Sequence, residues 1–232
     1  MLRRDLSVVP RTTQRGLSIV ELMVGITVGL IIVAGAVLIT STQLGNHRRL
    51  LLETQLQQDL RATADVITRE LRRAGYWDQA QSGVWSENGA AVSKNPFAAL
   101  VPASGATSDI EFRYWRRVGD TGPFGFKLES GVIRSRIGGA WQDLTDAQTM
   151  EVTGFAVTLS DAASYQLPCP RLCADGTQNC WPTLELRTAT VDIAARAKTD
   201  ATVTRALSSS TRLRNDRIRF NDPLNPDLVC PA

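Results

Sequence analysis

Gly16, Leu17 and Glu21 are the residues whose types and spacing could support chemistry. Arg15 and Gly16 end a basic leader, Leu17 begins an apolar segment, and Glu21 is a lone carboxylate within that segment. A charged side chain in the hydrocarbon core of a membrane costs about 2.5–3.5 kcal/mol, so such residues usually have a partner. Cleavage of the peptide bond after Gly16 would create an α-amine four residues from Glu21. The pattern therefore predicts a leader that is removed and a helix that packs with other helices.

An uncharged run of 18 residues, Leu22–Ile39, is long enough to cross a membrane. At about 1.5 Å per residue it covers about 27 Å, close to the hydrocarbon core of about 30 Å. The arginines of residues 1–16 hold the amino terminus in the cytoplasm by the positive-inside rule, which sends the rest of the chain across. The run is too long for a secretory signal peptide. A plain single-span anchor would explain the run, but not Glu21 or the glycine that precedes it.

Gly25 and Gly29 have the GxxxG spacing that lets membrane helices approach closely. Glycine is also common in membrane helices in general. The spacing alone therefore leaves helix packing and simple composition as open interpretations.

Beyond the uncharged run the sequence keeps a helical period. Apolar residues recur at spacings of three or four and predict one stripe on an amphipathic helix. The stripe consists of Leu52, Leu56, Leu60, Ala64, Ile67 and Leu71. Arg72 and Arg73 suit the last turn and Gly75 suits the stop, so we expect a helix from about Leu17 to Ala74. Gly45-Asn46 is the point at which it could bend or fray.

The sequence pattern of residues 76–232 predicts a β-rich head. Residues 76–108 are expected to form a partly ordered loop region anchored by Trp77, Trp85 and Phe97, and turns are expected at Glu129–Val132 and near Gly138-Gly139. An antiparallel sheet that covers the apolar stripe gives an α+β fold, with a long N-terminal helix packed on a mostly antiparallel β-sheet head. Short segments rich in β-branched or aromatic residues predict strands at Ile110–Trp115, Phe124–Glu129, Val132–Ile137, Val152–Leu159, Leu184–Ala194 and Arg212–Phe220.

The cysteines Cys169, Cys173, Cys180 and Cys230 all lie in the part of the chain that is predicted to be exported. An even number of cysteines in that compartment predicts disulfides. Four cysteines allow three pairings, and the sequence does not choose among them, although we expect Cys230 to be joined to the loop that holds the others. There is no CxxC pair, and the only histidine, His47, lies beside the membrane segment, so no metal site is predicted.

The formal net charge of +3 comes from the leader, because residues 1–16 carry four arginines and one aspartate and residues 17–232 sum to zero. Nucleic-acid binding needs clustered and unneutralised positive charge, so no nucleic-acid partner is expected. Local arginine clusters at residues 113–117 and 212–219 are interpreted as solvated or salt-bridged strand faces.

Catalytic motifs are missing from the sequence. A single histidine excludes most Ser-His-Asp and Cys-His arrangements, and there is no P-loop, GxGxxG or HExxH motif. We therefore predict no enzymatic activity and no cofactor. The oxygen-rich segment Asn221–Asp227 could bind calcium, but it lacks the glycine and closing glutamate of an EF-hand loop, and a turn-rich tail is the simpler interpretation.

The segment Arg15–Leu22 resembles the class III signal of type IV prepilins and type II secretion pseudopilins. The resemblance implies that a prepilin peptidase cuts after Gly16 and N-methylates Leu17, and that Glu21 is the fifth-position glutamate that sets the register of assembly. Most members have Phe where this chain has Leu17. The implied organisation is a leader peptide at 1–16, a transmembrane or fibre-core half of the helix at 17–44, an amphipathic periplasmic half at 45–75 and a β-rich head with a disulfide loop at 76–232.

Two further segments refine the resemblance. Glu70–Tyr76 looks like the minor pilins of the PilW type, and Arg212–Asn215 is similar to their endings and to those of the J-type pseudopilins. The resemblance implies a minor pilin of a type IV pilus, held in the inner membrane by a single span with a periplasmic head and later placed in the fibre or at its tip.

The implied partners are the prepilin peptidase, other minor pilins, the major pilin and the inner-membrane assembly platform, in a complex that primes pilus assembly. Two alternatives stay open. One is a J-like minor pseudopilin of type II secretion. The other, of a different class, is a pilus-tip module for adhesion or DNA binding.

Overall fold

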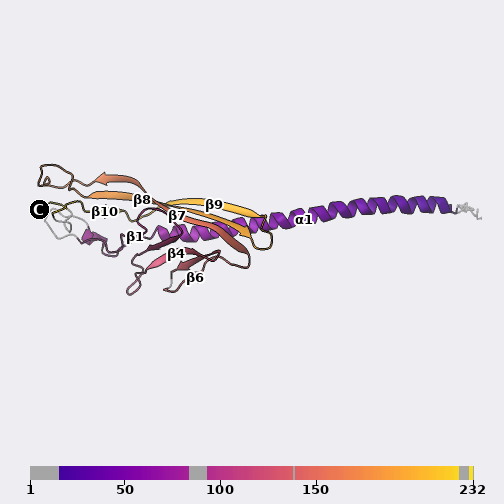
Figure 1. The fold of residues 1–232 in the computed structure, drawn as a ribbon, viewed down its shortest axis with the longest axis horizontal. Helices are drawn as coiled ribbons and strands as arrows, with labels where there is room; N and C mark the ends of the chain where they lie inside the picture. Colours follow the sequence, from indigo (N-terminus) through magenta and orange to yellow (C-terminus); the bar gives the residue numbers. More distant parts are fainter. Residues whose placement is uncertain (1–15, 84–92, 138, 225–229, 232) are drawn as a thin grey trace, which may run out of the picture. The chain divides into compact units, whose positions relative to one another are not determined.

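The computed structural model describes residues 16–83, 93–137, 139–224 and 230–231. The predicted leader up to Arg15, together with Trp85 and Asp227, lies outside the described residues. The chain divides into two compact units, Met1–Arg49 and Leu50–Ala232. The long helix α1, Ile19–Leu71, runs through both (Figure 1). It stays helical at Gly45-Asn46, where the sequence suggested that it could bend or fray.

The first unit contains the apolar part of α1, and its large apolar side chains are all exposed. Its hydroxyl side chains bond to carbonyls of the same helix: Thr27 to Val24, Thr40 to Ala36, and Ser41 and Thr42 to Leu38, at 2.9–3.0 Å. Polar groups in a membrane must be satisfied internally because no water is available there. These four hydroxyl groups are therefore satisfied within the helix itself.

The second unit consists of the C-terminal part of α1 and two antiparallel sheets (Figure 1). The first sheet has the order β1-β3-β4-β5-β6, and the second has the order β10-β8-β7-β2, with β9 also paired to β8. The strands of the first sheet are β1 Leu100–Val101, β3 Asp109–Phe112, β4 Phe124–Glu129, β5 Val132–Arg136 and β6 Gln142–Asp143. Those of the second are β2 Gly105–Thr107, β7 Met150–Gln166, β8 Thr183–Ala197, β9 Thr204–Arg212 and β10 Arg217–Arg219.

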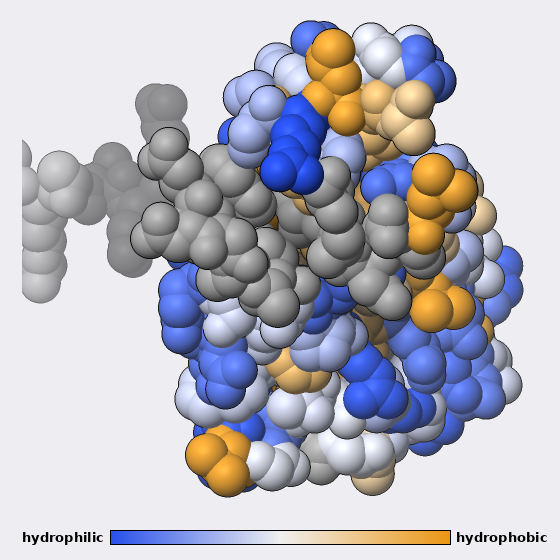
Figure 2. All heavy atoms as spheres, turned by 90° about the vertical axis from the view of Figure 1, so that its left-hand side faces the viewer, coloured by the Kyte–Doolittle hydropathy of each residue, from blue (hydrophilic) through white to orange (hydrophobic). Residues whose placement is uncertain are grey.

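The predicted stripe of α1 is confirmed as the centre of the core. Leu56, Leu60, Ala64, Ile67 and Leu71 are buried, and Leu52 packs against them at the edge. Aromatic side chains of the first sheet and small or branched side chains of β8 complete this core. On the end of the second unit shown in Figure 2, hydrophilic residues predominate and hydrophobic ones form separate spots. The α+β fold with a helix on antiparallel sheets is therefore the observed one.

The turn predicted at Glu129–Val132 is confirmed. Ser130 and Gly131 both have positive φ, 52° and 77°, and Glu129 pairs with Val132 across the hairpin. Two successive residues with positive φ are typical of the type I′ turn that matches the twist of a β-hairpin. The second turn joins β5 to β6, where Ser135 pairs with Gln142; Gly138 lies outside the described residues.

The strand assignment differs from the prediction in several places. β9 was not predicted, because its Ser-rich sequence lacks apolar alternation; it pairs along β8 at the edge of the second sheet, where such residues are tolerated. The predicted strand Arg212–Phe220 is interrupted in the structure. The buried Leu213 still donates its amide to Arg187 O of β8, whereas Arg214 and Asn215 bond to backbone carbonyls of residues 72–74, just after α1. The strand resumes as the short β10. The region expected to be loop also holds the 3-10 helix η1, Ala80–Gly83, and the strands β1 and β2.

The disulfides of the head join Cys169 to Cys230 and Cys173 to Cys180, and no cysteine of the described residues is free. This is the pairing that the sequence left open. Three of the four cysteines belong to the loop between β7 and β8, which has little secondary structure of its own. A disulfide typically contributes about 2–4 kcal/mol, mainly by constraining the unfolded chain, so these bonds hold a loop that buries little apolar area.

Leu60→Ala should destabilise the head by about 2–5 kcal/mol, because it leaves a cavity in a well-packed core. Leu60 is fully buried, whereas Leu51 on the same helix is 71% exposed, so Leu51→Ala is the matched control. Thermal unfolding of the full chain in detergent, followed by circular dichroism, measures the difference. Equal melting temperatures for the two variants would contradict the assignment of the stripe to the core.

Candidate processing and assembly sites

The Gly16–Leu17 bond lies just before α1, in exposed backbone that is not helical. Ser18 opens the helix, since its carbonyl accepts a hydrogen bond from the amide of Leu22 at 3.1 Å. A peptidase needs an extended and accessible segment around the bond that it cuts. The local structure at Gly16 and Leu17 is compatible with that need.

Glu21 lies in the first turn of α1 and is exposed. A carboxylate in the first turn is stabilised by the helix dipole, typically by 0.3–1 kcal/mol. Ser18 and Glu21 also have the spacing of a capping box, a signal that our sequence analysis missed. The position of Glu21 in the first turn thus favours the helix start, and this effect is separate from the assembly role that the resemblance implies.

The apolar part of α1 exposes large side chains on every face. Leu17, Ile19, Ile31, Leu38 and Leu44 are each more than 60% exposed. Among the described residues, α1 is the one helix long and apolar enough to cross a membrane. Gly25 and Gly29 lie one turn apart on it, with no side chain near either position. Lipid or other helices must therefore cover this surface, and the two glycines mark a face where another backbone could approach closely.

At its other end, α1 stops at residues whose carbonyls bond to three distant segments. A helix leaves its last four carbonyls without partners inside the helix. Here Arg214 N donates to Arg72 O, Asn215 Nδ2 donates to Arg73 O and Ala74 O at 3.3 and 3.0 Å, and Asn95 Nδ2 donates to Gly75 O at 2.8 Å. Trp115 N donates to Tyr76 O at 2.8 Å. We call this set of contacts the helix-end junction.

Gly75 makes the turn at the junction possible. Its φ is +77°, a left-handed conformation that favours glycine and commonly ends a helix. A Cβ at this position would lie 3.4 Å from Asn215 Cβ and 3.5 Å from an Arg187 nitrogen. The helix was predicted to run to Ala74 and to stop at Gly75; α1 itself ends at Leu71, and residues 72–75 form the turn that follows it. The backbone conformation of Gly75 favours glycine there, whereas a Cβ would make only ordinary van der Waals contacts.

Arg187 lies under the junction and was not singled out from the sequence. It belongs to the inward face of β8 and is 4% exposed. Its guanidinium donates to Ala98 O at 2.7 Å and to Asn215 O at 3.0 Å, while its Nε has no hydrogen-bond partner among the described residues. Burial lowers the pKa of this guanidinium to about 10. A buried cation bonded to two loop carbonyls joins the loop before β1 to the segment after β9.

Glu70 forms a second buried polar contact beside the junction. Its two carboxylate oxygens accept hydrogen bonds from Arg73 Nη1 at 3.0 Å and from the Tyr114 hydroxyl at 2.7 Å. Burial, together with the hydrogen bond to the Glu70 carboxylate and its negative charge, raises the pKa of Tyr114 to about 12. The phenol therefore stays protonated and links the end of α1 to the residues that follow β3.

The junction brings together Glu70–Tyr76 and Arg212–Asn215, the two segments whose sequences resemble those of minor pilins. They are more than 130 residues apart, yet Arg214 and Asn215 bond to the backbone of Arg72, Arg73 and Ala74. Leu213, which precedes Arg214, is fully buried. The contacts between these two segments give a physical reason why each segment needs its own sequence.

A protein-family model described as prepilin peptidase-dependent protein B, or PpdB, matches residues 49–213. The match covers more than half of the chain. The chain belongs to the PpdB family. A search of curated proteins and a search of solved structures each found no match.

Membership in the PpdB family identifies a pilin-like protein that depends on prepilin peptidase, and the single N-terminal apolar helix is consistent with a single-pass membrane anchor. The PpdB match begins at Arg49 and so excludes Gly16, Leu17 and Glu21. The family match of the head and the signal-like segment at Arg15–Leu22 rest on different residues, and each indicates a relation to prepilin peptidase.

Metal ligation is the remaining question raised by the sequence. Within the described ranges no group of three or more His, Cys, Asp or Glu residues could hold a metal ion. In the segment proposed for calcium, Asn221 Nδ2 donates to Trp181 O and Thr183 Oγ1, and Asp222 accepts a bond from Leu224 N. The described part of that segment therefore uses the Asn221 amide to bond to residues 181 and 183 and the Asp222 carboxylate to make a local turn.

Asn215→Ala should destabilise the head by about 1–2 kcal/mol, since Ala74 O loses its donor and Arg73 O keeps only the Tyr76 amide. For a chain of this size that corresponds to a melting temperature lower by about 2–8 °C. Asn179 is exposed in the disulfide loop, so Asn179→Ala is the matched control. Thermal unfolding of the full chain in detergent checks the prediction; an unchanged melting temperature for Asn215→Ala would show that the junction adds nothing to stability.

Proposed function

We propose that this protein is a minor pilin of a type IV pilus. In this proposal prepilin peptidase cuts after Gly16 and N-methylates Leu17, and the protein waits in the inner membrane with its head in the periplasm. It then joins other minor pilins, and the major pilin, in a complex on the assembly platform that primes the fibre. The observation that carries the proposal is a PpdB-family head on the same chain as an exposed apolar helix preceded by Gly16-Leu17 and Glu21.

The charge at Glu21 explains how processing and assembly would be connected. Cleavage after Gly16 places a new α-amine four residues before Glu21. In a bundle of helices without water, a lone carboxylate is costly, and pairing with a neighbour's amine relieves much of that cost. Glu21 would therefore favour one axial register between neighbouring helices, the one that brings it to an amine.

The apolar surface supplies the contact that this register would align. Exposed side chains surround α1 from Leu17 to Leu44. Gly25 and Gly29 would let a second helix approach closely on one face, where packing and not the hydrophobic effect drives association in lipid. A single span with these features suits a subunit that is stored in the membrane and later moved into a fibre.

A J-like minor pseudopilin of type II secretion is the second candidate, because Arg212–Asn215 is similar to the endings of that group and the signal segment is shared. The two candidate functions predict different defects when the gene is deleted. Deletion of the gene should abolish surface pili if the first holds, and protein secretion through the outer membrane if the second holds.

Intact mass and amino-terminal sequencing test the processing step. In cells with prepilin peptidase, the protein should begin at N-methyl-Leu17; in cells without it, the leader should remain. The same mass in both strains, or a start at another residue in both, would overturn the proposal. The comparison needs no knowledge of which fibre the protein joins.

Glu21→Ala should be inserted and cut normally but enter the fibre at a much lower level, because the neighbour's amine then has no carboxylate partner. Glu21→Gln keeps the capping-box side chain and removes only the charge, so it should show the same defect if the charge matters. Sheared fibre fractions and membrane fractions, compared by immunoblot, measure incorporation. Normal incorporation of Glu21→Gln would assign Glu21 to helix capping alone.

A further inference from the structure

We propose that a groove beside the helix-end junction binds an acidic polypeptide segment of a neighbouring pilin-like subunit. The groove has a volume of about 380 Å³ and is lined mainly by Arg72, Arg73, Tyr76, Trp115, Arg116 and Arg214. We call it the arginine groove. The identity of the neighbour rests on the proposed function, whereas the preference for an acidic ligand rests on the groove itself.

The arginine groove holds more positive charge than its own carboxylates can neutralise. Glu70 is already bonded to Arg73 and Tyr114, and Asp120 lies 3.6 Å from both Arg116 and Arg117. Arg72 and Arg214, in contrast, have no ion pair or side-chain hydrogen bond within the described chain.

Arg72 and Arg214 are neighbours, because Arg214 N donates to Arg72 O at 3.2 Å. Both side chains are exposed. Both residues line the same groove, so one anion bound there can interact with both positive charges. Guanidinium groups bind carboxylates in a bidentate manner, which makes a carboxylate a suitable anion for this position.

The aromatic residues of the groove favour a polypeptide ligand. Tyr76 is 46% exposed, and its ring lies 6.4 Å from that of Trp115, which is half-buried. Tyrosine, tryptophan and arginine are the residue types that contribute most at protein–protein interfaces. A groove with this composition can hold the backbone and methylene groups of an acidic segment against the two rings while the arginines bind its carboxylates.

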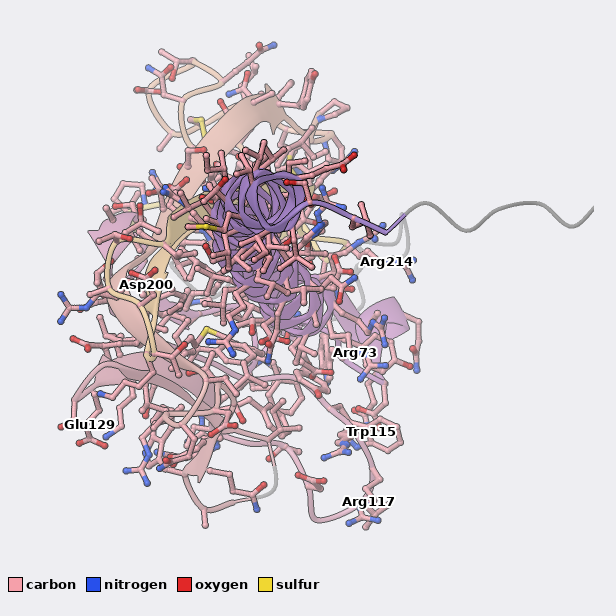
Figure 3. The ribbon with its side chains drawn as sticks, turned by 90° about the vertical axis from the view of Figure 1, so that its right-hand side faces the viewer. Arg73, Trp115, Arg117, Glu129, Asp200 and Arg214 are labelled. Carbon is pink, nitrogen blue, oxygen red and sulfur yellow. A yellow bond between two sulfur atoms is a disulfide. The ribbon has the colours of Figure 1, made fainter. Side chains whose placement is uncertain are left out.

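The wider distribution of charge argues for a short contact and not for a long nucleic-acid track. Figure 3 shows Arg214, Arg73, Trp115 and Arg117 on one side of the head and Glu129 and Asp200 on the other. Only Arg72 and Arg214 are unpaired among the groove arginines, and the chain after Gly16 has no net positive charge. Nucleic-acid binding needs several unneutralised cations along the backbone, whereas one or two carboxylates suffice for this groove.

Binding of a fluorescein-labelled hexaglutamate peptide to the full chain in non-ionic detergent tests the ligand class by fluorescence anisotropy. The double variant Arg72→Gln/Arg214→Gln should bind about tenfold more weakly than the wild type, since it loses two charge-assisted contacts. The double variant Arg61→Gln/Arg171→Gln removes the same charge at two exposed arginines outside the groove and should bind as the wild type does. The melting temperatures of the control variant and the groove variant are compared to exclude unfolding as the cause of weaker binding.

Equal binding of hexaglutamate by the groove variant and the wild type would overturn the proposal. So would tighter binding of a labelled hexathymidine oligonucleotide that depends on the same two arginines, because that result would assign the groove to a nucleic acid. In cells, the groove variant should be cut after Gly16 like the wild type but enter the fibre less well than the control variant. Normal cutting with normal incorporation would refute the partner and leave the proposed function intact, while an uncut chain would refute both.

Discussion

The end of α1 is the constraint on which the head depends. Its final carbonyls would lie without donors beside a core of buried residues, and an unsatisfied buried polar group costs about 1–3 kcal/mol. Donors from Asn95, Trp115 and Asn215 satisfy them, so three segments far apart in sequence must converge on one turn. Arg187 extends this convergence into β8, since its guanidinium bonds to two of the same segments. The two sheets are in this way tied to the helix by hydrogen bonds as well as by apolar packing.

The same principle, that a polar group removed from water needs a partner, applies at the amino-terminal end with a different outcome. In the head every junction carbonyl finds its donor within the chain. In the first unit, the apolar surface of α1 and the charge of Glu21 have no covering segment among the described residues. The junction of the head is thus satisfied by the chain itself, whereas the apolar part of α1 is not covered by any described residue.

The net charge of the sequence gave little information about where positive side chains gather on the folded head. The arginines at 212–219 were interpreted as solvated or salt-bridged strand faces. Arg212, Arg217 and Arg219 pair with Asp216 and Glu185, and Arg214 is exposed. Arg214 is different, because it follows the buried Leu213 into the junction and meets Arg72 from the far end of α1. A net charge of zero after Gly16 is thus compatible with a local concentration of guanidinium groups that only the fold creates.

Local pattern was enough to predict the helix, its apolar stripe, the turn at Gly75 that follows it, the type of fold and the hairpin at Ser130-Gly131, because period, turn chemistry and backbone conformation act over a few residues. The signal at Gly16–Glu21 is equally local, and it remains a prediction. Tertiary structure decided the disulfide pairing, the edge strand β9, the break after Arg212 and the positions of Arg187 and Tyr114. Apart from the Cys173–Cys180 bond, which spans seven positions, these features depend on contacts between residues that are tens to more than a hundred positions apart. A polar residue within a strand gives no sign of whether such a distant partner will contact it.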